Sequence, residues 1–185
     1  MLRARSEGGV QMFSGRRAVA AFVAFGLTLA MSSTALAGGD HRNVQMLDAC
    51  DGPSFNATIG PGTCERDGGL SFGQFIGQLV SMGQAPAWRF SPTQLTISAG
   101  GSISAFNRGG EFHTFTEVAN FGGGCVPQLN AILGLTPVPE CSNPALFGTT
   151  GAGPGGEVET GPLASGVHRF ECLIHPWMRT TVNAG

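Results

Sequence analysis

The sequence contains no lysine and few charged residues of any kind. Charged side chains make up 12% of its 185 residues, and all ten basic residues are arginine. Residues 38–185 hold six arginines against eleven acidic residues, which gives a formal charge of 6 − 11 = −5. A protein that binds nucleic acid needs a basic face. The composition therefore argues against a nucleic-acid partner.

Two further absences narrow the possible functions. No internal repeat is evident along the chain. No set of serine, histidine and aspartate, and no pair of carboxylates, occurs at a spacing typical of a hydrolytic active site. We therefore expect a protein that is not an enzyme.

The first 37 residues have the pattern of a secretory signal peptide. An arginine pair at 16–17 precedes an apolar stretch at 18–31, and a small-residue site follows at 35–37. This order is typical of a segment that is removed on export, and the apolar stretch is short for a membrane span. We expect cleavage before Gly38 and a periplasmic or secreted protein that does not span the membrane. A retained N-terminal anchor is the alternative, and the arginine pair leaves twin-arginine export open beside the general secretory route.

All five cysteines lie in the part of the chain that is expected after cleavage. An exported protein folds where thiols pair, and an odd count leaves one thiol free. Cys50 with Cys64, and Cys125 with Cys141, would each close a short loop rich in glycine and proline. Cys172 would then be the free thiol. Spacing alone leaves open the alternative in which Cys172 joins a bridge and another cysteine is free.

The run Cys172-Leu-Ile-His175-Pro-Trp-Met178 is the most informative motif of the chain. It places a thiol, an imidazole and a thioether three residues apart. The preceding residues, 167–171, alternate as in a strand, and Pro176 cannot continue a ladder. The three side chains can therefore converge just past the strand end. A soft metal held by two histidines, one cysteine and a weak axial methionine is typical of a blue-copper electron-transfer site.

Such a site needs a second imidazole, and His113 is the best candidate. His41 lies in the N-terminal segment and His168 at the far end of the last-but-one strand, so we do not expect them to be ligands. We expect the Thr114 backbone to lie beside the first imidazole and Asn107 to brace its own loop. A structural zinc site, or a catalytic site open to water, could use the same cysteine and histidines, but a thioether ligand argues against both.

The periodicity of apolar residues predicts mostly strands. We expect a helix over Ser71–Met82 with a capping box at Ser71 and Gln74, and a helical turn near 129–133. Residues 40–68 have the composition of an irregular, bridged segment, and 121–156 form a long glycine- and proline-rich stretch that the second cysteine pair would staple. Strands are expected near 88–90, 95–99, 103–105, 112–118, 157–159 and 167–182. Several short strands separated by turns predict an antiparallel sandwich or barrel.

Five sequence features together resemble the cupredoxin family of plastocyanins and pseudoazurins. They are Trp88-Arg-Phe-Ser-Pro92, Leu95-Thr-Ile-Ser-Ala-Gly100, Asn107, His113 and the C-terminal run, whose short Cys-x-x-His-Pro-x-Met loop is similar to that of the amicyanins. The resemblance covers 86–185 and implies an all-β, Greek-key β-sandwich. Residues 38–85 would form an N-terminal extension with one helix and a disulfide bridge.

The resemblance also implies a function. One type 1 copper per chain would be held by His113, Cys172, His175 and Met178, and the protein would carry one electron at a time to a redox protein partner. Electrons would pass through an exposed edge of His175, inside an apolar patch lined by Pro176 and Trp177. A copper chaperone or storage protein with the same ligands is the alternative. The chain departs from the family in two ways. Many members have Asn directly after the first histidine, where this chain has Thr114. The 58 residues between His113 and Cys172 are more than the usual separation.

Overall fold

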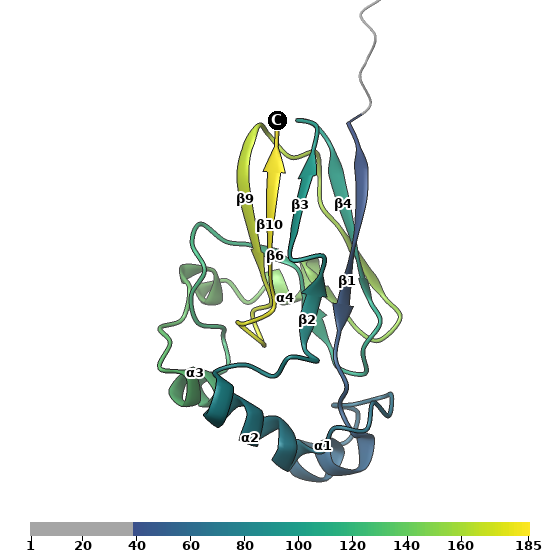
Figure 1. Cartoon of the computed structure of the whole chain (residues 1–185), viewed down its shortest axis with the longest axis vertical. Helices are drawn as coiled ribbons and strands as arrows, with labels where there is room; N and C mark the ends of the chain where they lie inside the picture. The colour runs from purple at the N-terminus through teal and green to yellow at the C-terminus, as the bar shows by residue number, and fades with distance from the viewer. Residues whose placement is uncertain (1–38) are drawn as a thin grey trace, which may run out of the picture. The chain divides into compact units, whose positions relative to one another are not determined.

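The structure is a computed structural model, and it describes residues 39–185. Its strands form two four-stranded sheets that face each other (Figure 1). The first sheet contains, in spatial order, β2 (Arg89–Ser91), β1 (His41–Leu47), β4 (Ser102–Asn107) and β8 (Glu157–Glu159). The second contains β3 (Gln94–Ile97), β10 (Arg179–Ala184), β9 (Gly166–Glu171) and β6 (Thr116–Glu117). A separate ladder joins β5 (His113–Thr114) to β7 (Gly151–Ala152).

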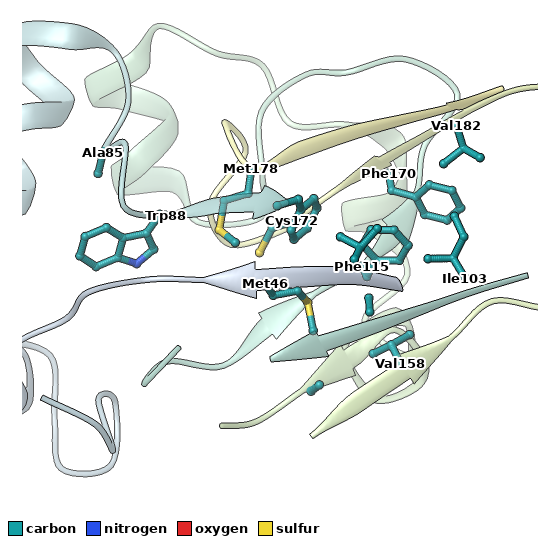
Figure 2. Packing of buried hydrophobic residues seen from close by; sticks show 14 of the residues in the cluster. Met46, Ala85, Trp88, Ile103, Phe115, Val158, Phe170, Cys172, Met178 and Val182 are labelled. Carbon is teal, nitrogen blue, oxygen red and sulfur yellow. The ribbon is translucent and has the colours of Figure 1, made fainter. Parts of the chain in front are cut away.

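Apolar side chains from both sheets fill the space between them. Val44 of β1 and Ile103 of β4 are fully buried, as is Val182 of β10. Phe170 of β9 stacks on Phe115, with the ring centroids 4.3 Å apart. Several of these residues lie in one cluster (Figure 2). Because burial of one large apolar side chain contributes about 1.5–3 kcal/mol, this layer is the main source of stability.

The predicted sandwich is confirmed, but two of its strand pairs are parallel. β1 pairs with β4 in parallel, and β3 with β10, whereas the other pairs are antiparallel. Parallel neighbours need a crossover connection rather than a hairpin. Both helices of the N-terminal region and the strands β2 and β3 lie between β1 and β4 in the sequence, and β2 and β3 belong to different sheets. Connections that pass from one sheet to the other, like the one between β2 and β3, are a feature of Greek-key sandwiches.

The N-terminal helices gather at the end of the sandwich that lies away from the C-terminus (Figure 1). The predicted helix is confirmed as α2 (Phe72–Met82), which begins after its N-cap Ser71. Ser71 and Gln74 form the expected capping box, and Gly83 ends the helix with φ 69°. The short helix α1 (Gly52–Thr58) was not predicted, because seven residues are too few to show an apolar period.

The interpretation of 40–68 as irregular is wrong for its first part, which forms strand β1. Only Val44 and Met46 alternate as buried residues in this strand, which is too little for a strand pattern. The proposed boundary between 38–85 and 86–185 therefore runs between strands of one sheet. The predicted signal segment, 1–37, lies outside the described residues. Within 39–185, no helix is long and apolar enough to cross a membrane.

The long stretch 121–156 is built from short elements. The expected helical turn is confirmed as α3 (Pro127–Leu133). Two further helical segments were not predicted: a 3-10 helix η1 (Pro139–Ser142) and the short helix α4 (Leu146–Thr149). Glycine and proline make up 14 of these 36 residues and interrupt the apolar pattern, so the sequence alone carries no clear period here.

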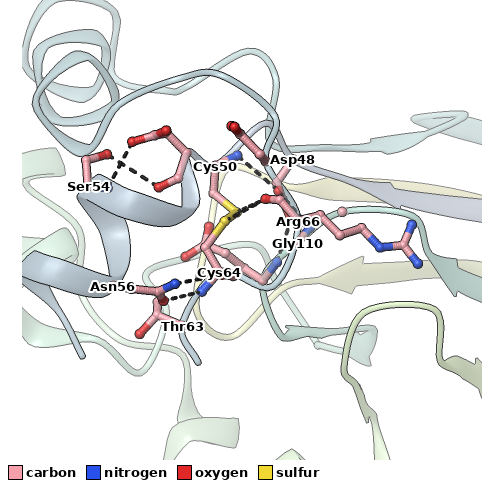
Figure 3. Close-up of a disulfide and its surroundings, with 12 residues drawn as sticks. Asp48, Cys50, Ser54, Asn56, Thr63, Cys64, Arg66 and Gly110 are labelled. Atoms are coloured by element: carbon pink, nitrogen blue, oxygen red, sulfur yellow. Dashed lines mark hydrogen bonds between the residues drawn. A yellow bond between two sulfur atoms is a disulfide. The ribbon is translucent and has the colours of Figure 1, made fainter. Parts of the chain in front are cut away.

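Two disulfides staple the loops, and both pairings are those that spacing favoured. Cys50 pairs with Cys64 (Figure 3) and Cys125 with Cys141. The paired residues are 14 and 16 positions apart, and bridges over loops of this size stabilise a fold by about 3 kcal/mol each. Cys172 is free and buried. The alternative in which Cys172 joins a bridge is therefore wrong.

Candidate metal centre

Three soft or nitrogen donors meet at the helical end of the sandwich. His113 lies on β5, Cys172 follows β9 directly, and His175 lies in the loop between β9 and β10. Their ligand atoms all lie within 4.8 Å of one another, and all three residues are buried. Cys172 Sγ is 4.0 Å from Nδ1 of His113 and 3.8 Å from Nδ1 of His175. The chain thus directs one sulfur and two ring nitrogens at one point.

The loop that carries two of these donors closes on itself. The backbone N–H of Met178 donates to the His175 carbonyl at 2.9 Å, and that of Cys172 donates to the Met178 carbonyl at 3.1 Å. Pro176, at the turn, has no N–H to leave unpaired. Met178 is fully buried, and its side chain points toward that of Cys172 (Figure 2). The same short loop thus carries Met178 together with two of the three donors.

Hydrogen bonds fix the cysteine and the neighbouring loop. The Thr114 N–H donates to Cys172 Sγ at 3.4 Å, and the Thr114 hydroxyl accepts from the Leu173 N–H at 2.8 Å. Asn107 donates to the carbonyls of Glu111 and Ala152 at 2.7 and 2.9 Å. Both expectations are confirmed: Thr114 lies beside the donors, and Asn107 braces its own loop.

Two buried carboxylates face the outer nitrogens of the imidazoles. Asp48 Oδ2 is 2.8 Å from His113 Nε2, and Glu111 Oε2 is 3.6 Å from His175 Nε2. Trp88 Nε1 donates to the same Glu111 oxygen at 2.5 Å. None of the three was predicted for this site. Glu111 could have been suspected from its position two residues before His113, but nothing in the sequence near Asp48 indicates a partner 65 residues away.

The electrostatics of the cluster favour a thiolate. Burial alone raises the pKa of Cys172, but hydrogen bonds and charge from His113 and His175 outweigh it and hold the pKa well below the ordinary thiol value. Burial likewise opposes a charged His113, yet its hydrogen bonds to Asp48 and Cys172 raise its pKa to about 9. A thiolate is the form of cysteine that binds metals. The pocket therefore prepares Cys172 for a cation.

The pKa values of the two neighbouring carboxylates, Asp48 and Glu111, are shifted in opposite directions. Burial raises the pKa of Asp48, but hydrogen bonds from His113, Gly110 and Glu111 reverse this and lower the pKa to about 2. For Glu111, burial is the dominant cause and its pKa is raised, although the charge of His175 and the Trp88 hydrogen bond act against it. Asp48 is thus a fixed negative charge beside the cluster.

The remaining two histidines lie elsewhere in the described chain, as expected. His41 is exposed and its Nδ1 is 3.0 Å from the Ser102 hydroxyl. His168 is 2.6 Å from Glu117 and 2.8 Å from the Ala164 carbonyl. Neither belongs to the donor cluster.

The expectation of an exposed His175 edge is wrong. His175 is only 3% exposed. The ring of Phe75, on α2, meets it edge-on with centroids 6.3 Å apart, and the Trp177 ring lies at 5.5 Å. Phe75 of α2 and Trp177 therefore cover the imidazole that the sequence predicted to be open. An apolar groove of about 530 Å³, between α1, α2 and α3, reaches His175 from the side.

Comparison with known proteins gives a distant likeness to several solved structures. No protein-family model and no curated protein matches the chain. The structure is similar to a purple cupredoxin from Nitrosopumilus maritimus, at 13% identity and a TM-score of 0.39 over 78% of this chain and 99% of that one. It is also similar to oxidised plastocyanin from Dryopteris crassirhizoma (13%, 0.36, 77% and 99%) and to a reduced amicyanin variant (17%, 0.34, 52% and 73%).

The donor set itself fits a type 1 copper site. A thiolate and two imidazoles with an adjacent thioether are the ligands of blue-copper centres, whereas structural zinc sites use cysteine and histidine without methionine. The donors are buried and already gathered within 4.8 Å in the protein alone. The chain is thus a two-sheet β-sandwich whose one cluster of metal donors in residues 39–185 fits a single copper.

Proposed function

We propose that this protein is an exported type 1 copper protein that carries one electron at a time. His113, Cys172, His175 and Met178 would bind the copper. The observation that carries the proposal is the free, buried Cys172, whose sulfur lies about equally far from the Nδ1 atoms of both histidines. These residues would hold the copper in both oxidation states, and the metal would supply the one-electron chemistry.

The rigidity of the site supports a carrier rather than an enzyme. All four proposed ligands are buried, and hydrogen bonds within 172–178 and from Thr114 hold the sulfur in place. A site that needs little rearrangement between oxidation states transfers electrons quickly. If Met178 completed the ligand set, no position would stay open for a substrate, and an open position is what catalytic metal sites keep.

Export and a protein partner are parts of the same proposal. The two disulfides support folding in an oxidising compartment, since such bridges are rare in reducing ones. The partner would be a redox protein. Because Phe75 and Trp177 cover His175, we expect this partner to meet the surface of α2 and of the 172–178 loop rather than the imidazole itself.

A copper chaperone or storage protein is the second candidate, and the burial of His175 favours it. A covered ligand slows electron exchange with a partner, but it retains the metal. Measuring the reduction potential and the self-exchange rate of the copper-loaded protein separates the two functions. A carrier gives a reversible one-electron wave and fast self-exchange. Slow self-exchange, together with transfer of Cu(I) to an acceptor chelator only after unfolding, would contradict the electron-carrier function and favour the storage function.

A further inference from the structure

The outer nitrogen of His113 is bonded to a carboxylate from a distant part of the chain. His113 Nε2 is 2.8 Å from Asp48 Oδ2, and the two side chains are 0% and 1% exposed. The other ring nitrogen, Nδ1, faces Cys172. When Nε2–H donates to a carboxylate, the lone pair of Nδ1 is left for a metal. The contact with Asp48 therefore selects the nitrogen that faces the donor cluster.

Asp48 is itself held on several sides. Its Oδ2 accepts from the N–H groups of Gly110 at 2.9 Å and Glu111 at 3.0 Å, and its Oδ1 accepts from the Cys50 N–H at 3.2 Å (Figure 3). The neighbouring Gly109 has no side chain, and a Cβ there would overlap the Asp48 carboxylate. The carboxylate is thus fitted into the turn that leads to His113, and the first disulfide anchors the segment that follows it.

The parallel pairing of β1 explains how Asp48 reaches this turn. Met46 of β1 lies opposite Asn107 of β4, so the residues that follow each strand end run side by side. Glu111 does not play the same part for His175. It lies 3.6 Å from the ring nitrogen, beyond hydrogen-bond distance, and already accepts from Trp88.

We propose that Asp48 is a positioning residue of the metal centre, which orients His113 for binding and favours the more highly charged metal ion. This inference rests on the proposed function for its choice of copper. A fixed negative charge in a buried place stabilises Cu(II) more than Cu(I), because Coulomb energy scales with the charge of the ion and is weakly screened there. Outer partners of metal-bound histidines also raise the basicity of the ligand.

The test replaces Asp48 by its neutral isostere in the mature protein. Asp48→Asn should weaken Cu(II) binding by about 10- to 100-fold, the usual loss for such partners, and Cu(I) binding by less. A tenfold fall in the ratio of the two affinities raises the reduction potential by about 59 mV for one electron. Chelator competition in each oxidation state and voltammetry measure these quantities.

Asp51→Asn is the matched control. It makes the same chemical change three residues away, at the half-buried N-cap of α1, a position that asparagine fills as well as aspartate. The control should leave both affinities and the potential unchanged. An Asp48→Asn protein with the affinities and potential of the control would overturn the inference.

Two further measurements separate this inference from the proposed function and from misfolding. Zn(II) affinity should fall in Asp48→Asn as well, so an effect on zinc supports the positioning role even if wild-type protein gives no blue copper spectrum. In the zinc-loaded wild type, nitrogen-15 NMR should find the His113 proton on Nε2, slow to exchange with solvent. A proton on Nδ1 instead would overturn the inference without any variant.

Discussion

A single methyl group added at Gly109 should disturb the stability of the fold and the metal site together. A Cβ at this position would overlap the Asp48 side chain and come within 3.0 Å of its backbone nitrogen. Asp48 is buried and bonded to three N–H groups and to His113, so it cannot move aside at low cost. Overpacking of this kind costs about 1–3 kcal/mol, and the loss of a hydrogen bond to a charged group about 1.5–3 kcal/mol.

We therefore expect Gly109→Ala to lower the unfolding free energy of the metal-free protein by about 3 kcal/mol or more. For a domain of this size, that corresponds to a fall in Tm of about 6–12 °C. Urea unfolding and a thermal melt, both with a chelator present, measure the two quantities.

Gly77→Ala provides the control for this glycine. Gly77 lies exposed within α2, and a Cβ there meets nothing within 4 Å. Alanine favours a helix over glycine by about 0.5–1 kcal/mol, so this variant should be slightly more stable than the wild type. Equal stability of Gly109→Ala and the wild type would refute the account of the turn beside Asp48.

Other predictions concern the outer parts of the site and the bridges. Trp88→Phe removes the hydrogen bond to Glu111, and should cost about 1.5–3 kcal/mol where the carboxylate is ionised but only about 0.5–1.5 kcal/mol where it is protonated. Because the folded pKa of Glu111 is raised above its unfolded value, protonation favours the folded state, and this contribution is lost as pH rises through the folded pKa. Urea unfolding of both proteins at acidic and neutral pH checks this, and an equal loss at both would contradict it. Replacing Cys125 and Cys141 together by serine should lower stability by about 3 kcal/mol in the same assay and leave the copper spectrum unchanged, because neither bridged cysteine belongs to the donor cluster; a changed spectrum would contradict this.

Most of the candidate donors could be predicted because three of the four lie in one short run of the sequence. Cys172, His175 and Met178 are spaced so that a loop past a strand end brings them together, and the odd cysteine count singled out the thiol. His113 followed from the need for a second imidazole. The helix at 72–82 was equally accessible, because its capping box and apolar stripe are local features.

What the sequence did not reveal depends on contacts between distant residues. Strand β1 is mostly polar, and its parallel pairing with β4 is set by tertiary packing rather than by its own pattern. Asp48 reaches His113 only through that pairing. The burial of His175 follows from the packing of Phe75 against its ring. The apolar stripe of a helix does not indicate which surface of the protein that helix will cover.

The most direct test of the central claim is a Cu(II) titration of the metal-free mature protein, followed by its visible spectrum and compared with Cys172→Ser. The account predicts an intense thiolate-to-copper band that grows to an end point of one copper per chain, and its complete absence in the serine variant, in which far-UV circular dichroism still shows the folded sandwich. A wild-type protein that binds copper without this band, or a band that survives the loss of Cys172, would contradict the account.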